Sequence, residues 1–200
     1  MSLSPIHELP ILLASSAAWR SQALANLGIP HRQAAPPFDE PSYQQGPLEA
    51  HVMKLALGKA LSLIEPGTAV IGLDQMIEIE GEVLGKPGDF ETAFRQLKKL
   101  NGKTHRLVNG LAVLYQSQRI QLWDQCFLTM RTLSDDELKH YLSLDQPFGC
   151  AGSYQIESIG ASLFEVVKVD DLQSVLGLPG NLLINAFRQL GYSNLLPSKG

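Results

Sequence analysis

Residues 69–87 read AVIGLDQMIEIEGEVLGKP, and this stretch indicates how the chain is built. The apolar run at 69–73 is typical of a buried strand, and it ends at the carboxylate of Asp74. Glu80-Gly81 predicts a hairpin turn, and Gly85-Lys86-Pro87 follows soon after it. Open α/β folds place ligands where such strands end, so we expect Asp74 to act on a ligand. A structural turn or capping aspartate is the alternative.

The rest of the chain shows strand and helix patterns in alternation. Apolar runs predict strands at residues 9–15, 68–74, 105–115, 119–130 and 161–168. Apolar periodicity and capping signals predict helices at residues 17–27, 47–64, 89–100, 134–144 and 181–191. Because helices alternate with strands and two long antiparallel strands lie in the middle, we expect a mixed α/β or α+β fold. No linker or repeat interrupts residues 1–200, which favours one domain.

The composition excludes several classes of protein. The chain has 200 residues, 44% of them hydrophobic, which is enough for a sizeable core. A net charge of −4 without a long basic run argues against nucleic-acid binding. We also expect no membrane segment and no signal peptide, hence a cytoplasmic location. The two cysteines and five histidines are not spaced as metal ligands, so we expect reduced thiols and no zinc site.

Two cations lie on apolar helix faces. Lys59 falls on the stripe formed by Leu48, Val52, Leu55 and Leu63, whereas Lys54 falls on the opposite face. An inward lysine must either snorkel to solvent or meet an anion. Arg20 lies in the first turn of the first helix, directly after a strand, where free N–H groups suit phosphate.

These cations and two acidic positions form a candidate polyphosphate site. The acidic pair Asp39-Glu40 lies in a proline-rich loop and is by itself a weak Mg²⁺ signal. Combined with Asp74, Arg20, Lys59 and Lys86, it would suit a metal-bound triphosphate. The spacing alone does not show that the side chains converge.

Eight motifs in order resemble the Maf family of nucleotide pyrophosphatases, over about residues 10–192. They are LLASSAAWRSQALANLGI, FDE, LALGKA, VIGLDQ, LGKP, LNGKTH, CAGSYQIES and LGLPGNLL. The resemblance implies an elongated, bent mixed sheet flanked by helices. It also implies two lobes with a central cleft, similar to inosine-triphosphate pyrophosphatases.

The same resemblance implies the reaction. A nucleoside triphosphate would be hydrolysed to the monophosphate and pyrophosphate with Mg²⁺ or Mn²⁺ as cofactor. The matching positions for phosphate and metal chemistry are Ser15, Arg20, Glu40, Lys59, Asp74 and Lys86. Among them, Glu40 and Asp74 would hold the metal, and Asp74 matches the proton acceptor.

Three further residues resemble those of family members that hydrolyse 7-methyl-GTP: Trp19, Gln75 and Glu157. An indole attracts the cationic methylated ring by about 0.5–2 kcal/mol, and a carboxylate accepts the N–H groups of guanine. A core aromatic at 19 and a solvated loop acid at 157 are the alternatives. Ala17 and Ala18 stand where the family usually has Ser and Pro, so one hydroxyl near the phosphates is missing.

The sequence is also compatible with other functions. The substrate could be another nucleotide, such as UTP, dTTP or a modified pyrimidine nucleotide, and a homodimer is compatible with the sequence. A nucleotide-sensing regulator of cell division is the alternative from another class, although a sensor has no need of a water-activating acid. A dinucleotide-dependent oxidoreductase is excluded because no glycine fingerprint follows the first strand.

Overall fold

The computed structural model describes residues 3–197, which form two compact units that interleave along the chain. The first unit contains the described residues up to Gln75, Asn109–Asp124 and the described residues from Asp171 onward. The second unit contains Met76–Val108 and Gln125–Asp170. The expected single domain over residues 1–200 and the expected cleft between two lobes therefore stay predictions.

The elements confirm a mixed α/β fold. The α-helices are α1 (Ala18–Asn26), α2 (Leu48–Leu61), α3 (Phe90–Leu100), α4 (Asp135–Asp145) and α5 (Gly180–Gln189). The strands are β1 (Ser4–Pro5), β2 (Ile11–Ala14), β3 (Arg32–Ala34), β4 (Ala69–Ile79), β5 (Glu82–Leu84), β6 (Thr104–Tyr115), β7 (Gln118–Met130), β8 (Phe164–Lys168) and β9 (Tyr192–Ser193). Short 3₁₀ turns are η1 (Ile6–Glu8), η2 (Ala151–Ser153), η3 (Ile159–Leu163) and η4 (Ser174–Leu176). No helix within residues 3–197 has the length and apolar character needed to cross a bilayer.

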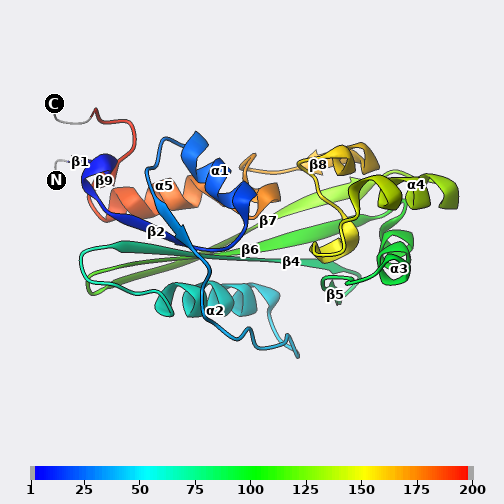
Figure 1. Cartoon of the computed structure of the whole chain (residues 1–200), viewed down its shortest axis with the longest axis horizontal. Coiled ribbons are helices and arrows are strands. Elements are labelled where there is room, and N and C mark those ends of the chain that lie inside the picture. Colours follow the sequence, from blue (N-terminus) through cyan, green and yellow to red (C-terminus); the bar gives the residue numbers. More distant parts are fainter. Residues whose placement is uncertain (1–2, 198–200) are drawn as a thin grey trace. The chain divides into compact units, whose positions relative to one another are not determined.

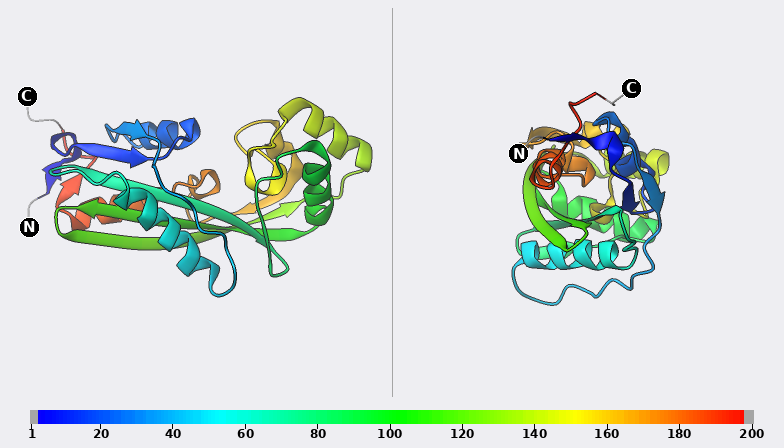
Figure 2. Two further views of the ribbon diagram at one scale, coloured as in Figure 1. Left: turned by 60° about the horizontal axis from the view of Figure 1, so that its bottom comes forward. Right: turned by 90° about the vertical axis from the view of Figure 1, so that its left-hand side faces the viewer.

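In the first unit, helices cover both faces of a sheet ordered β3-β2-β4-β6-β7. Strand β2 pairs in parallel with β3 and with β4. Helices α1 and α5 lie on one face and α2 on the other, as Figures 1 and 2 show. The side chains alternate accordingly: Leu13 and Ile71 pack with α1 and α5, whereas Leu12 and Val70 pack with α2.

Helix α2 lies directly on the sheet backbone because two strand residues lack side chains. A Cβ atom on Gly72 of β4 would lie 1.9 Å from the carbonyl oxygen of Ala56. A Cβ atom on Gly110 of β6 would lie 2.3 Å from the carbonyl oxygen of Val52. This close approach fixes the part of α2 that carries Lys59 against strand β4.

The second unit contains the predicted hairpin and two paired helices. Strands β4 and β5 pair antiparallel, and the turn residues Glu80 (φ 52°) and Gly81 (φ 82°) both have positive φ, as a two-residue hairpin requires. Helix α3 packs against α4. The capping signal at the start of α4 is a capping box, in which Ser134 and Glu137 bond to each other.

The predicted strand at 68–74 is too short, and this changes the position of Asp74. The parallel pairing of β4 with β2 ends at the partners Ala14 and Gly72, but β4 continues to Ile79 and pairs with β5 from Ile77 onward. Asp74 therefore does not end its own strand. It lies two residues beyond the end of the parallel ladder with β2, so the edge at which it lies is that of β2.

Other boundaries moved less. Helix α2 spans 48–61 instead of 47–64, and β8 begins at Phe164 because residues 159–163 form a 3₁₀ turn. The polar strand β3 and the two-residue strands β1 and β9 were not predicted. Each is too short or too polar to leave a periodic apolar pattern.

Candidate active site

Lys59 joins two carboxylates in the first unit. Its Nζ lies 2.6 Å from Oδ1 of Asp74 and 2.9 Å from Oε1 of Glu40. The side chains of Lys59 and Asp74 are only 10% and 7% exposed, whereas that of Glu40 is 52% exposed. The inward position predicted for Lys59 is thus confirmed, and the lysine meets anions there instead of snorkelling to solvent.

The loop that carries Glu40 is seated on α2. A Cβ atom on Gly58 would lie 2.2 Å from Cζ of Phe38, so the phenyl ring occupies the space that a side chain at 58 would take. Gly58 directly precedes Lys59, and Phe38 lies two residues before Glu40. Contact between these two residues therefore brings the glutamate to the lysine.

One carboxylate oxygen of Asp74 is left without a hydrogen bond within residues 3–197. Its Oδ1 accepts the hydrogen bond from Lys59, but its buried Oδ2 has no hydrogen-bond partner among the described residues. Burial raises the pKa of Asp74, while the positive charges of Lys59 and Arg20 oppose that rise. A buried carboxylate oxygen with raised proton affinity is suited to accept a proton from water.

Arg20 approaches the same carboxylate from α1. Its Nη1 donates to the carbonyl oxygen of Leu73 (3.1 Å), the residue before Asp74, and its buried Nε has no partner among the described residues. Burial lowers the pKa of Arg20, and the carboxylates of Asp74 and Glu40 oppose that lowering. The guanidinium therefore has a donor without a partner in the described part of the chain, close to the carboxylates of Asp74 and Glu40.

Ser15 and the start of α1 lie at the end of β2. The buried Oγ of Ser15 accepts a hydrogen bond from the backbone N–H of Ala17 (3.2 Å). Helix α1 has no side-chain cap and no acidic residue in its first turn. Its first N–H groups are left for another acceptor, which agrees with the expected phosphate position.

Trp19 and Gln75 differ in how freely they can meet a ligand. Trp19 is 41% exposed on α1, so the core-aromatic alternative is excluded. The amide nitrogen of Gln75 donates to the carbonyl oxygens of Ser174 (3.2 Å) and Val175 (3.3 Å). The side-chain amide N–H groups of Gln75 are therefore engaged with the backbone of residues 174 and 175.

Lys86 and Glu157 both belong to the second unit. Both are exposed. The pKa of the Cys150 thiol is raised, mainly by burial and further by the negative charge of Glu157. The positive charge of Lys86 opposes this rise. The structure thus gathers Arg20, Glu40, Lys59 and Asp74 in one unit, whereas the convergence of Lys86 and Glu157 with them stays a prediction.

A buried amide–carboxylate network in the first unit was not predicted. Asn109, which is 0% exposed on β6, donates from Nδ2 to Asp124 Oδ1 and to the carbonyl oxygen of Ser174, both at 2.8 Å. The hydroxyl of Ser174 donates to Oδ2 of Asp124. The signal in the sequence is a lone asparagine inside an apolar strand, since Ser174 lies far away along the chain and the contact with Asp124 depends on the register of two strands.

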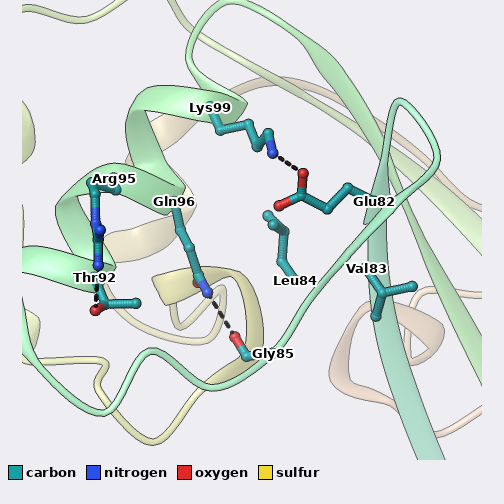
Figure 3. Close-up of a pocket in the computed structure, with 8 residues that line it drawn as sticks. All are labelled: Glu82, Val83, Leu84, Gly85, Thr92, Arg95, Gln96 and Lys99. Atoms are coloured by element: carbon teal, nitrogen blue, oxygen red, sulfur yellow. Dashed lines mark hydrogen bonds and ion pairs between the residues drawn. The ribbon is translucent and has the colours of Figure 1, made fainter. Parts of the chain in front are cut away.

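A pocket of about 310 Å³ lies in the second unit, between the hairpin and α3 (Figure 3). It is lined by Glu82, Val83, Leu84, Gly85, Thr92, Arg95, Gln96 and Lys99. Its polar groups largely bond to one another: Lys99 pairs with Glu82, and Gln96 donates to the carbonyl oxygen of Gly85. None of the lining residues belongs to the predicted site, so the pocket is not part of it.

The carboxylates of Asp74 and Glu40 fit a divalent cation that is bound jointly by the protein and by substrate phosphates. Within residues 3–197, no three His, Cys, Asp or Glu side chains gather as a metal site. The carboxylate of Asp74 and the half-exposed carboxylate of Glu40 are nevertheless hard oxygen ligands. Mg²⁺ is commonly held by one or two carboxylates together with water and substrate phosphates, which this pair allows.

Comparisons with known proteins agree with the motifs. The family model described as "Maf-like protein" matches residues 10–190. The 7-methyl-GTP pyrophosphatase of Chromohalobacter salexigens is 35% identical over 190 residues, which are 92% of this chain and 98% of that protein. The 7-methyl-GTP pyrophosphatase of Alcanivorax borkumensis is 38% identical over 84% of this chain and 88% of its own.

A solved structure, that of the Staphylococcus aureus Ham1 protein, is a more distant match. It has 13% sequence identity and a TM-score of 0.43, and the match covers 60% of this chain and 71% of that one. The family model, by contrast, spans nearly the whole chain, and the relatives match it at more than a third of their positions. The chain belongs to the Maf family.

Proposed function

We propose that this protein hydrolyses N7-methyl-GTP to N7-methyl-GMP and pyrophosphate. The observation that carries the proposal is the buried carboxylate of Asp74, which keeps one oxygen open beside Lys59 and Arg20. The names of the relatives, which match most of the chain, support the same reaction and the same substrate. A nucleotide sensor would have no use for such an acid.

In the proposed reaction, water attacks the α-phosphorus as its proton passes to Oδ2 of Asp74. The bond between the α-phosphorus and its bridging oxygen to the β-phosphate breaks, and pyrophosphate leaves with the bond's electron pair. Lys59 holds the carboxylate in position through Oδ1. Arg20, the hydroxyl of Ser15 and the free N–H groups of α1 bind phosphate oxygens, and Lys86 adds a further cation.

We also propose a divalent metal, Mg²⁺ or Mn²⁺, as cofactor. When bound, it would neutralise phosphate charge and stabilise the leaving pyrophosphate. Glu40 and Asp74 would supply its protein ligands. Because Lys59 bonds to both carboxylates, it holds them next to each other.

Selection of the methylated base is assigned to Trp19 and Glu157. The exposed indole of Trp19 is free to stack on a cationic ring. The exposed carboxylate of Glu157 would accept the N1–H and N2–H of guanine, whose acidity rises with methylation. Gln75 would contribute indirectly, since its amide nitrogen is engaged with backbone carbonyls.

A pyrophosphate-release assay over a nucleotide panel tests the proposal. The panel contains 7-methyl-GTP, GTP, UTP, dTTP and a modified pyrimidine triphosphate, each with Mg²⁺ and with excess EDTA. We expect the highest kcat/KM for 7-methyl-GTP, loss of activity in EDTA and its return with Mg²⁺ or Mn²⁺. A preference for UTP or dTTP would contradict the substrate assignment, and full activity in EDTA would exclude the metal.

A cytoplasmic location and a homodimer are lesser proposals. The low cysteine content, two residues in 200, suits a reducing compartment. Cell fractionation tests the location. Sedimentation of the purified chain tests the dimer, and a monomeric mass at micromolar concentration would contradict it.

A further inference from the structure

Segment 171–177 of the first unit contains the short 3₁₀ turn η4 and is held by several side-chain hydrogen bonds. Asp171 accepts from the backbone N–H groups of Gln173 (2.9 Å) and Asn181, so its carboxylate connects the start of the segment with the first turn of α5. Ser174 is 1% exposed although it belongs to a three-residue turn. Its buried carbonyl oxygen accepts from both Asn109 and Gln75.

The fixed segment ends against Arg20. Gly177 follows η4 with φ 74°, in the left-handed region that favours glycine. A Cβ atom on Gly177 would lie 2.8 Å from Nη2 and 3.2 Å from Nε of Arg20. The backbone at 177 thus lies next to Nη2 and Nε of the guanidinium, while Nη1 donates to the carbonyl oxygen of Leu73.

Two steps therefore connect β6 and β7 with the guanidinium. Asn109 and Asp124 hold Ser174 through its carbonyl oxygen and its hydroxyl. Ser174 begins the turn that places Gly177 against Arg20. This path joins Asn109 and Asp124 to Arg20 through the segment.

We infer that Asn109, Asp124 and Ser174 are positioning residues for Arg20. The network holds segment 174–177, and the segment lies against the guanidinium, whose Nη1 donates to the carbonyl oxygen of Leu73. The inference rests on the proposed function only in that Arg20 binds a polyphosphate. Gln75 acts through the same segment, so its part in the reaction is positional too.

A double-mutant cycle with inorganic triphosphate as the probe tests the inference. Binding is measured by calorimetry with Mg²⁺ present for wild type, Ser174→Ala, Arg20→Ala and the double variant. Loss of one buried hydroxyl hydrogen bond should weaken binding about two- to tenfold in the Ser174→Ala variant. In the Arg20→Ala background the same change should have no further effect, because the group it positions is gone.

The matched control is Ser193→Ala. Ser193 is also a buried serine of the first unit, and its hydroxyl oxygen accepts one hydrogen bond from Leu195. It should leave triphosphate binding unchanged even if it lowers the melting temperature. A merely structural role for Ser174 would make the two serine variants alike.

A second variant reaches Arg20 from the other end of the path. Gly177→Ala adds a methyl group against the guanidinium, so it should also weaken triphosphate binding in the wild-type but not in the Arg20→Ala background. If Ser174→Ala does not fold, this variant still tests the last step of the path, and equal losses in both Arg20 backgrounds would overturn that step.

Equal losses in both Arg20 backgrounds, wild-type binding by Ser174→Ala, or no triphosphate binding by the wild type would overturn the inference. Nucleotide turnover, measured in parallel, separates the two proposals. Coupling without turnover would leave the positioning network and remove the proposed reaction. Turnover without coupling would do the reverse.

Discussion

Two carboxylates on strand β4, four residues apart, each pair with a cation but differ in what they leave open. Glu78, in the second unit, accepts from Arg106 through Oε2 and from the backbone N–H of Gly81 through Oε1. Asp74, in the first unit, accepts from Lys59 through Oδ1 only. Its buried Oδ2 has no partner among the described residues.

The difference lies in the number of partners and not in charge. Glu78 has a partner on each oxygen, the backbone of the hairpin turn on Oε1 and Arg106 of β6 on Oε2, so it serves the structure of the second unit. Leaving a buried oxygen without a partner costs free energy of folding, about 1–3 kcal/mol. Such a cost is tolerated most often where the group has chemistry to perform, which favours Asp74 as the reactive acid.

The largest expected effect distinguishes these two acids by rate. Asp74→Asn keeps the shape but removes the basic oxygen, so kcat on 7-methyl-GTP should fall about 10²–10⁴-fold, as for loss of a general base. Glu78→Gln, the matched change, should leave kcat within about threefold of wild type. Steady-state pyrophosphate release measures both, and near-wild-type turnover by the Asp74 variant would reverse the assignment.

The next effect concerns stability. Lys59→Met removes the cation from a buried pair and should lower the free energy of unfolding by about 3–5 kcal/mol at neutral pH. Lys54→Met, on the exposed face of the same helix, should change it little. Urea unfolding of both variants checks this, and equal small losses would mean that the Lys59–Asp74 pair contributes nothing.

The stability loss of Lys59→Met should depend on pH through the ionisation of Asp74. A carboxyl group whose pKa is raised by folding contributes stability at low pH, and that contribution is lost as pH rises through the folded-state pKa. Without Lys59 the pKa of Asp74 should rise further, because one opposing charge is gone. The deficit of Lys59→Met relative to wild type should therefore shrink as the pH falls.

The smallest effect tests whether the second unit contributes to base selection. Glu157→Gln removes a charge-assisted hydrogen bond of about 1.5–3 kcal/mol, or roughly 10–150-fold in kcat/KM for 7-methyl-GTP. GTP, whose ring is neutral, should lose less. Trp19→Arg should also lower the ratio of the two rates, because it sets like charge against the methylated ring. An unchanged ratio in both variants would remove these residues from base recognition.

The sequence predicted those site residues whose position depends on spacing within one helix or strand. Lys59 interrupts a helical stripe of apolar residues, so its burial could be read from spacing alone. The position of Asp74 could not, because the apolar run ends where the partner β2 ends and not where β4 ends. The hairpin that follows supplies new pairing for the remaining residues.

The network around Ser174 left no comparable pattern. Asn109, Asp124 and Ser174 lie in three separate segments, and each alone resembles an ordinary polar residue. Their contacts arise only when β6, β7 and the turn η4 are packed together. The same holds for Phe38 on Gly58, a contact that brings Glu40 to Lys59 and that no spacing rule contains.

The pH dependence of kcat/KM for wild type, Lys59→Met and Lys54→Met is the most direct test that Asp74 accepts the proton beside Lys59. The wild-type rate should rise with pH as the Asp74 carboxyl loses its proton. In Lys59→Met this rise should move to higher pH, since the charge that lowers the pKa of Asp74 is gone, and in Lys54→Met it should not move. A rise at the same pH in wild type and Lys59→Met would contradict the assignment of Asp74 as the proton acceptor.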